Sequence, residues 1–97
     1  MTQRIQPNRA TTRDRPYGVV VTRTVDELVR ERDRAPVQYS SDLVQVFQSQ
    51  VREWYRGLDF GIDYSMDWTN TLTTYDFHYA FSDASHALLF KLTWGGK

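Results

Sequence analysis

The spacing of apolar side chains changes along the chain, and each spacing predicts a different element. Residues 18–22 are a run of small and β-branched side chains, which predicts a short buried strand. Thr24 and Glu27 follow with the spacing of a capping box, in which each side chain bonds the other residue's backbone amide. A short, mostly charged helix is therefore expected, ending before Pro36. Its narrow apolar edge consists of Val25, Leu28 and Val29.

A longer amphipathic helix is expected over residues 43–58. Ser40 or Ser41 can cap its first turn, and Asp42 places a negative charge where the helix dipole favours one. Gly57 supplies a stop near its end. We expect this helix to be the main core helix, because its apolar residues form one continuous face. That face consists of Leu43, Val44, Phe47, Val51, Trp54, Tyr55 and Leu58.

Beyond this helix the apolar period falls to two, which predicts an antiparallel hairpin. Residues 60–68 and residues 73–81 both alternate large apolar side chains with small or polar ones. Only a loop of even length keeps the two apolar faces together. A two-residue loop pairs Tyr64 with Tyr75. A four-residue loop pairs Tyr64 with Phe77 and places Asp63 opposite His78, and we favour it because it opposes unlike polar partners.

Residues 82–94 fit two structures. As a strand, they alternate Leu88, Phe90, Leu92 and Trp94 with other residues. As a helix, they would be capped by Ser82 and would carry apolar side chains nearly all round. The local pattern alone favours the strand.

A family resemblance bears on this segment. From Phe81 to Gly95 the chain passes from an aromatic strand end through an acidic turn at Asp83 into Ala-x-x-Phe-Lys-Leu-x-Trp-Gly. These residues resemble the ends of small, mostly uncharacterised phage and viral proteins. The arrangement is also similar to ferredoxin-like domains, in which an aromatic strand end leads into the second helix. The resemblance implies a helix over 82–94 and a viral origin, and it implies no activity.

Together the patterns predict an α+β fold: a short N-terminal strand, two helices, an antiparallel hairpin and a C-terminal helix or strand. This is a ferredoxin-like arrangement with a three-stranded sheet, and the missing fourth strand leaves one sheet edge open. A chain of 97 residues supports one domain, which we place at residues 17–97. Residues 1–16 have few apolar side chains and two prolines, and we predict a flexible basic arm there.

Charge is uneven although its sum is zero. Residues 1–34 contain eight basic and five acidic side chains, whereas residues 35–97 contain four and seven. Arginine makes bidentate contacts with carboxylates and phosphates, so the arm is the first candidate for binding a partner. The predicted partner-binding residues are Arg4, Arg9, Arg13 and Arg15 of the arm, with Tyr17 and Trp94 as aromatic anchors.

Composition excludes several classes of activity. The chain has no cysteine, which excludes a disulfide framework, a thiolate nucleophile and a cysteine-ligated metal. Its glycines lack the spacing of a phosphate-binding loop, and no Gly-x-Ser-x-Gly sequence is present. No apolar run reaches the roughly 18 residues of a membrane span. We therefore expect a non-enzymatic protein without a cofactor, in the cytoplasm or, for a viral protein, in the host cytoplasm or the virion.

One polar cluster is a candidate metal or acid–base site. Asp63, Asp67, Asp76 and His78 share the polar face of the predicted hairpin. Carboxylates and an imidazole can hold a divalent cation or transfer protons. A flat, solvated sheet face is a poor place for either, because catalysis needs a concave site with little water. We predict no metal site, with Asp63, Asp76 and His78 as the less favoured alternative.

These observations favour a protein–protein interaction or assembly module of the phage accessory or virion type. It would dock through the arginine-rich arm and the open sheet edge, on another protein or on its own copies. The alternative is a nucleic-acid-binding protein whose arm contacts phosphates. No membrane association is expected.

Overall fold

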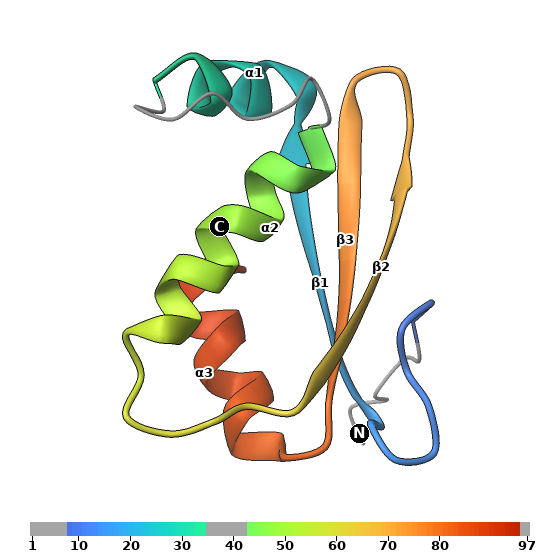
Figure 1. Ribbon diagram of the computed structural model, residues 1–97. Helices are drawn as coiled ribbons and strands as arrows, with labels where there is room; N and C mark the ends of the chain where they lie inside the picture. The colour runs from blue at the N-terminus through green and yellow to red at the C-terminus, as the bar shows by residue number, and fades with distance from the viewer. Residues whose placement is uncertain (1–7, 35–42, 96–97) are drawn as a thin grey trace.

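A computed structural model of the chain describes residues 8–34 and 43–95 (Figure 1). The described residues form three strands and three helices, which confirms the predicted α+β class. In chain order the elements are β1 (Tyr17–Thr24), α1 (Val25–Arg34), α2 (Leu43–Arg56), β2 (Tyr64–Asn70), β3 (Thr74–Phe81) and α3 (Ala84–Trp94). The predicted caps of α2 and the predicted stop of α1 lie outside the described residues. No described helix has the length and apolar character needed to cross a membrane.

The sheet has the order β1-β3-β2, and β3 is antiparallel to both neighbours. This is the three-stranded sheet predicted from the sequence, and it is compatible with a small ferredoxin-like arrangement. Helices α2 and α3 lie on one side of the sheet (Figure 1). We call that side the helix face and the opposite side the outer face.

The capping box at the start of α1 forms as predicted. The N–H of Thr24 donates to Oε1 of Glu27 at 2.9 Å, and the N–H of Glu27 donates to Oγ1 of Thr24 at 3.1 Å. Both bonds satisfy amides that the helix itself leaves unpaired. Leu28 is the buried residue of this helix. The remaining α1 side chains are partly or fully exposed, as expected for a mostly charged helix.

The C-terminal segment is a helix, so the strand suggested by local alternation is wrong. Asp83, rather than Ser82, caps α3, because its carboxylate accepts from the N–H of Ser85 at 2.7 Å. Ala87 and Phe90 lie three residues apart on the side of α3 that reaches the core, and both are buried.

The hairpin register differs from both predicted registers. Tyr64 lies opposite Phe81, and Asp67 lies opposite His78. Strand β2 begins at Tyr64, so the predicted start at residue 60 is also wrong. The aromatic side chains of the two strands still lie on the same face of the sheet, because the observed register differs from the predicted ones by an even number of residues.

A threonine-rich turn explains the register. The N–H of Thr71 donates to the carbonyl of Thr74 at 2.9 Å and closes the loop between the two strands. The Thr71 hydroxyl accepts from the N–H groups of Thr73 at 3.2 Å and Thr74 at 3.1 Å. This side-chain bonding fixes a turn two residues further along the chain than the favoured four-residue loop.

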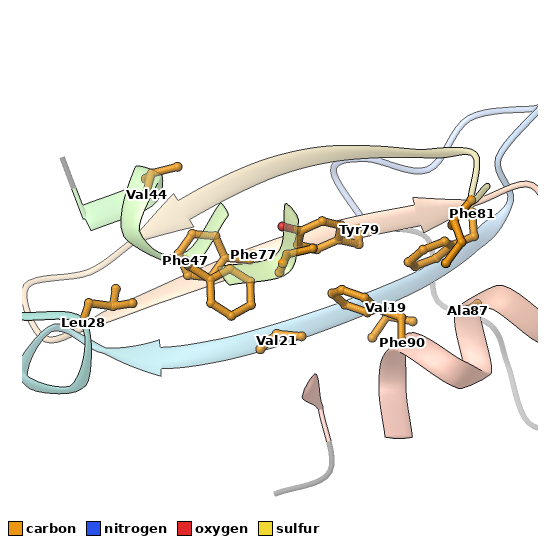
Figure 2. Close-up of a cluster of buried hydrophobic side chains, with 12 residues drawn as sticks. Val19, Val21, Leu28, Val44, Phe47, Phe77, Tyr79, Phe81, Ala87 and Phe90 are labelled. Carbon is orange, nitrogen blue, oxygen red and sulfur yellow. The ribbon is translucent and has the colours of Figure 1, made fainter. Parts of the chain in front are cut away.

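The core lies between the helix face and the two helices that cover it. Figure 2 shows Phe47 of α2 beside Phe77 of β3, and their ring centroids are 4.3 Å apart. Tyr79 lies two residues after Phe77 on the same strand, and burial raises the pKa of its hydroxyl. Phe90 of α3 contacts the ring of Tyr79 at a centroid distance of 4.5 Å. Side chains from both helices therefore meet the aromatic residues of the central strand.

Candidate association surfaces

The outer face of the sheet is partly covered by residues 8–16, which we call the arm segment (Figure 1). Asn8 organises it: its Oδ1 accepts from the N–H groups of Ala10 at 2.9 Å and Thr11 at 3.1 Å. The Asn8 Nδ2 donates to the carbonyl of Tyr79 at 3.1 Å. One side chain therefore both forms a turn and attaches it to the central strand. The predicted division at residue 17 stays a prediction.

The arm segment lies close to the sheet because small residues line the contact. Ala10 is 5% exposed, and its carbonyl accepts from Oγ of Ser65 at 2.9 Å. Ala80, on the outer face of β3, is fully buried. A Cβ atom at Gly18 would lie 2.7 Å from Nδ2 of Asn8, closer than real Cβ contacts allow. Gly18 is therefore required for the close approach of this segment.

Two arm arginines form ion pairs with the acidic outer face of the same chain. Nε of Arg9 lies 3.1 Å from Oδ2 of Asp67, and Nη2 of Arg15 lies 2.8 Å from Oδ1 of Asp63. The hydrogen bond from Arg15 lowers the pKa of Asp63. The pKa of Asp67 is lowered first by the backbone N–H of Trp68 and to a lesser degree by Arg9. The uneven charge of the sequence is thus partly compensated within one molecule.

The other predicted partner-binding residues lie in different surroundings. Arg4 is outside the described residues, and Arg13 is exposed and makes no ion pair in the described part of the chain. Tyr17 and Trp94 are half-buried and pack against the core. The Trp94 ring contacts Phe47 edge-on, at a centroid distance of 5.5 Å. These two rings therefore contribute to the core, and their role as anchors stays a prediction.

The polar cluster does not assemble as a metal site. The Asp76 carboxylate accepts from Oγ1 of Thr22 at 2.7 Å, and Nε2 of His78 lies 3.1 Å from Oγ1 of Thr69. The Asp63 carboxylate forms its ion pair with Arg15 of the arm segment instead. Within residues 8–34 and 43–95, no three acidic or histidine side chains are close enough to hold a metal ion.

Strand β1 has one paired edge and one open edge. Its pairing with β3 runs without interruption over eight residues. In the part of the chain that the structure describes, no strand pairs with its other edge. The N–H of Thr24 bonds the side chain of Glu27, and the carbonyl of Thr22 accepts from Nη1 of Arg23, so neither group serves the β1–β3 ladder. Because backbone direction alternates along a strand, the N–H and carbonyl of Val20 also point away from β3.

A groove of about 620 Å³ runs beside this open edge, between β1, α1 and the C-terminal end of α3. Leu92 lines the groove and is 71% exposed, whereas the side chain of Val20, opposite His78, lies on the outer face of the sheet and is 46% exposed. Leu88, one turn before Leu92 on α3, is 57% exposed. The groove lining includes Val20, Arg23, Glu27, Glu31, Leu92 and Trp94. We call the open edge of β1 together with Val20, Leu88 and Leu92 the edge surface.

Sequence reasoning anticipated the open edge but did not single out Val20, Leu88 or Leu92. A signal for the leucines was present, because a helix with apolar residues nearly all round has more apolar surface than one core can bury. The sequence did not indicate that Val20 is exposed, because a run of three valines is typical of a fully buried strand.

Comparisons with protein-family models, with curated proteins and with solved structures find no match for this chain.

Proposed function

We propose that this protein is a non-enzymatic association module whose partner adds a strand to the open edge of β1. The observation that carries the proposal is that edge itself, a β-branched strand of eight residues with continuous ladder pairing on one side. Natural sheets protect such edges with proline, bulges, charges or a covering segment. Strand addition satisfies the backbone groups of an open edge directly.

The apolar side of α3 supports the same surface. Leu88 and Leu92 are spaced one helical turn apart and are both exposed, while Ala87 and Phe90 face the core. A strand added beside β1 would lie next to α3, which contacts β1. Alternate side chains of the added strand would then bury these leucines, and we expect them to be apolar for that reason.

Strand β2 is also an edge strand of the described sheet, but the arm segment lies over the outer face beside it, which favours β1. Beside β2, the arm segment accepts a hydrogen bond from Ser65 and pairs Arg9 with Asp67. In this proposal Arg9 and Arg15 hold the arm segment on its own sheet, and Arg13 is the described arm arginine that remains available to a partner.

Nucleic-acid binding is the less favoured alternative. Arg9 and Arg15 would have to leave Asp67 and Asp63 before they could contact phosphates, and those carboxylates would then repel the same phosphates. The accessory or assembly role of the phage type is kept within the proposal, and it rests on the resemblance of residues 81–95 alone.

The proposal is tested by titrating the ¹⁵N-labelled protein with a capped peptide of alternating valine and threonine. We expect saturable shift changes in the amides of β1 and the C-terminal half of α3. Val20→Pro should abolish them, because it removes an outward N–H and leaves the β1–β3 ladder intact. Val20→Thr is the matched control and should bind normally. Shift changes confined to the arm segment, or equal binding by Val20→Pro, would refute the proposal.

A further inference from the structure

We infer that the strand added to β1 is β1 of a second copy of this chain, in a twofold-symmetric dimer that joins the two sheets into one. This inference rests on the proposed function and specifies its partner. A twofold axis perpendicular to the sheet makes the two β1 strands antiparallel and places both helix layers on the same side.

The sequence of β1 is complementary to itself about Val20. When Val20 pairs with Val20 of the second copy, the N–H and carbonyl groups that point away from β3 on each strand face each other and can form hydrogen bonds. The same register places Val19 opposite Val21, and Tyr17 opposite Arg23. Arg23 is the only charged residue of β1, so no like charges face each other. The Arg23 guanidinium stays engaged within its own chain, where it lies 5.4 Å from the centre of the Phe47 ring and donates to the Trp94 carbonyl at 2.9 Å.

A register centred on Val21 is less suitable. It would require the N–H of Thr24 to bond the second copy, but that N–H already donates to Glu27 in the capping box. In the register centred on Val20, the outward-pointing pairs within β1 are Val20 with Val20 and Gly18 with Thr22, and neither pair uses the Thr24 N–H.

Charge complementarity continues beyond the paired strands. In the register centred on Val20, Pro16 of the second copy lies opposite Thr24, beside the first turn of α1, and the chain before Pro16 then bends over the outer face of its own sheet, where Arg15 pairs with Asp63. The first turn of α1 is acidic, with Asp26 and Glu27 both exposed. The preceding chain contains Arg13, which is exposed and makes no ion pair among the described residues. Each copy would thus offer a cation where the other offers carboxylates.

The helix layer supplies the rest of the interface. A stable dimer buries about 800 Å² on each partner, which is more than a strand edge alone provides. Because both copies of α3 lie on the same side of the joined sheet, Leu88 and Leu92 of each copy would turn toward the other. The second copy therefore offers apolar surface of the same kind on the same side.

The inference is tested with single-cysteine variants, which are specific because the chain has no cysteine of its own. Val20→Cys places two thiols across the proposed axis and should give a disulfide-linked dimer of twice 11.4 kDa under mild oxidation. Leu72→Cys, at the 98% exposed tip of the hairpin, is the matched control and should crosslink slowly. Equal crosslinking of the two variants would overturn the inference.

Sedimentation of the full chain provides the second measurement. We expect a monomer–dimer equilibrium between micromolar and millimolar concentration, and Val20→Pro should remain monomeric. Arg13→Glu should weaken dimerisation by roughly two- to five-fold, as expected for an exposed ion pair, and Asp26→Arg should restore it in the double variant. A wild-type chain that stays monomeric throughout overturns the inference. Peptide binding at β1 by that monomer would leave the proposed function standing, whereas a Val20→Pro dimer would contradict both.

Discussion

Gly18 and Asn8 lie so close together that Gly18 has no room for a Cβ atom, which would come within 2.7 Å of the Asn8 amide nitrogen. The two residues belong to different segments, β1 and the arm segment. Their contact lets Asn8 reach the carbonyl of Tyr79 on the central strand. A single glycine in β1 thus permits the outer face of the sheet to be covered.

Gly18→Ala should therefore displace the arm segment while leaving the helix face intact. The loss of the Asn8–Tyr79 hydrogen bond and of the burial of Ala10 should reduce the free energy of unfolding by about 1–2 kcal/mol. Amide hydrogen exchange should accelerate at Ala10 and Thr11. Gly61→Ala is the control, because the nearest atom to its Cβ would be the Tyr55 hydroxyl at 3.6 Å. Unchanged exchange at Ala10 in Gly18→Ala would contradict the prediction.

The ion pairs of the arm segment predict a loss of stability in acid. Asp63 and Asp67 have lowered pKa values in the folded chain. Their contribution is therefore complete above the ordinary aspartate pKa of about 4 and is lost as the pH falls through the lowered values. Unfolding by denaturant at pH 6 and at pH 3 measures this change. High salt should reduce the contribution of both exposed pairs, because salt screens exposed charges.

The two aspartates should respond differently when their arginines are removed. Arg15→Gln should return the pKa of Asp63 toward its ordinary value, because the hydrogen bond from Arg15 is the main cause of its lowering. Arg9→Gln should move the pKa of Asp67 less, because the Trp68 backbone N–H is the main cause there. Carboxyl-carbon NMR titration measures both values. An equal response of the two carboxyls would show that the arm arginines act equivalently.

The cap of α3 can be tested by replacing each of two neighbouring residues with alanine. Asp83→Ala removes the acceptor for the Ser85 N–H and should reduce the free energy of unfolding by about 1 kcal/mol. Ser82→Ala should have a smaller effect, because Ser82 is exposed and does not cap the helix. Denaturant titration of both variants measures the difference. A larger effect at Ser82 would indicate that the helix begins one residue earlier.

The stacked pair of Phe47 and Phe77 should dominate the stability of the core. Phe47→Ala should reduce the free energy of unfolding by about 3–5 kcal/mol, because it opens a cavity where α2 meets the central strand. Phe60→Ala removes a ring of the same size that is 46% exposed and should change stability much less. Thermal melts of the two variants provide the comparison.

Local patterns were enough to predict β1, α1, α2 and a hairpin, because their signals lie within a few residues, but they favoured a strand where α3 forms. The capping box at Thr24 and the apolar face of α2 are examples. The hairpin register was predicted wrongly because it depends on the hydroxyl of Thr71, which bonds two backbone amides and fixes the turn. Periodicity defines which face is apolar and says nothing about which threonine forms the turn.

Contacts between distant segments were beyond sequence reasoning. Arg9 and Arg15 were predicted to bind a partner, which stays a prediction, and in the structure they contact Asp67 and Asp63 of the same chain. No local pattern indicates that Asn8 and Gly18 fit together. The apolar residues all round α3 did carry a signal for an uncovered surface, but that signal does not identify which leucines stay exposed.

The pairing of β1 with β3 has a consequence for synthesis on the ribosome. Tyr17 pairs with Phe81 and Thr24 pairs with Thr74, so β1 has no partner until most of the chain has been made. Contacts between such distant segments form slowly. During that time the three consecutive valines of β1 have two open edges instead of one, which exposes nascent chains to pairing with one another. Of the three described strands, β1 is therefore the one whose partner lies furthest along the chain.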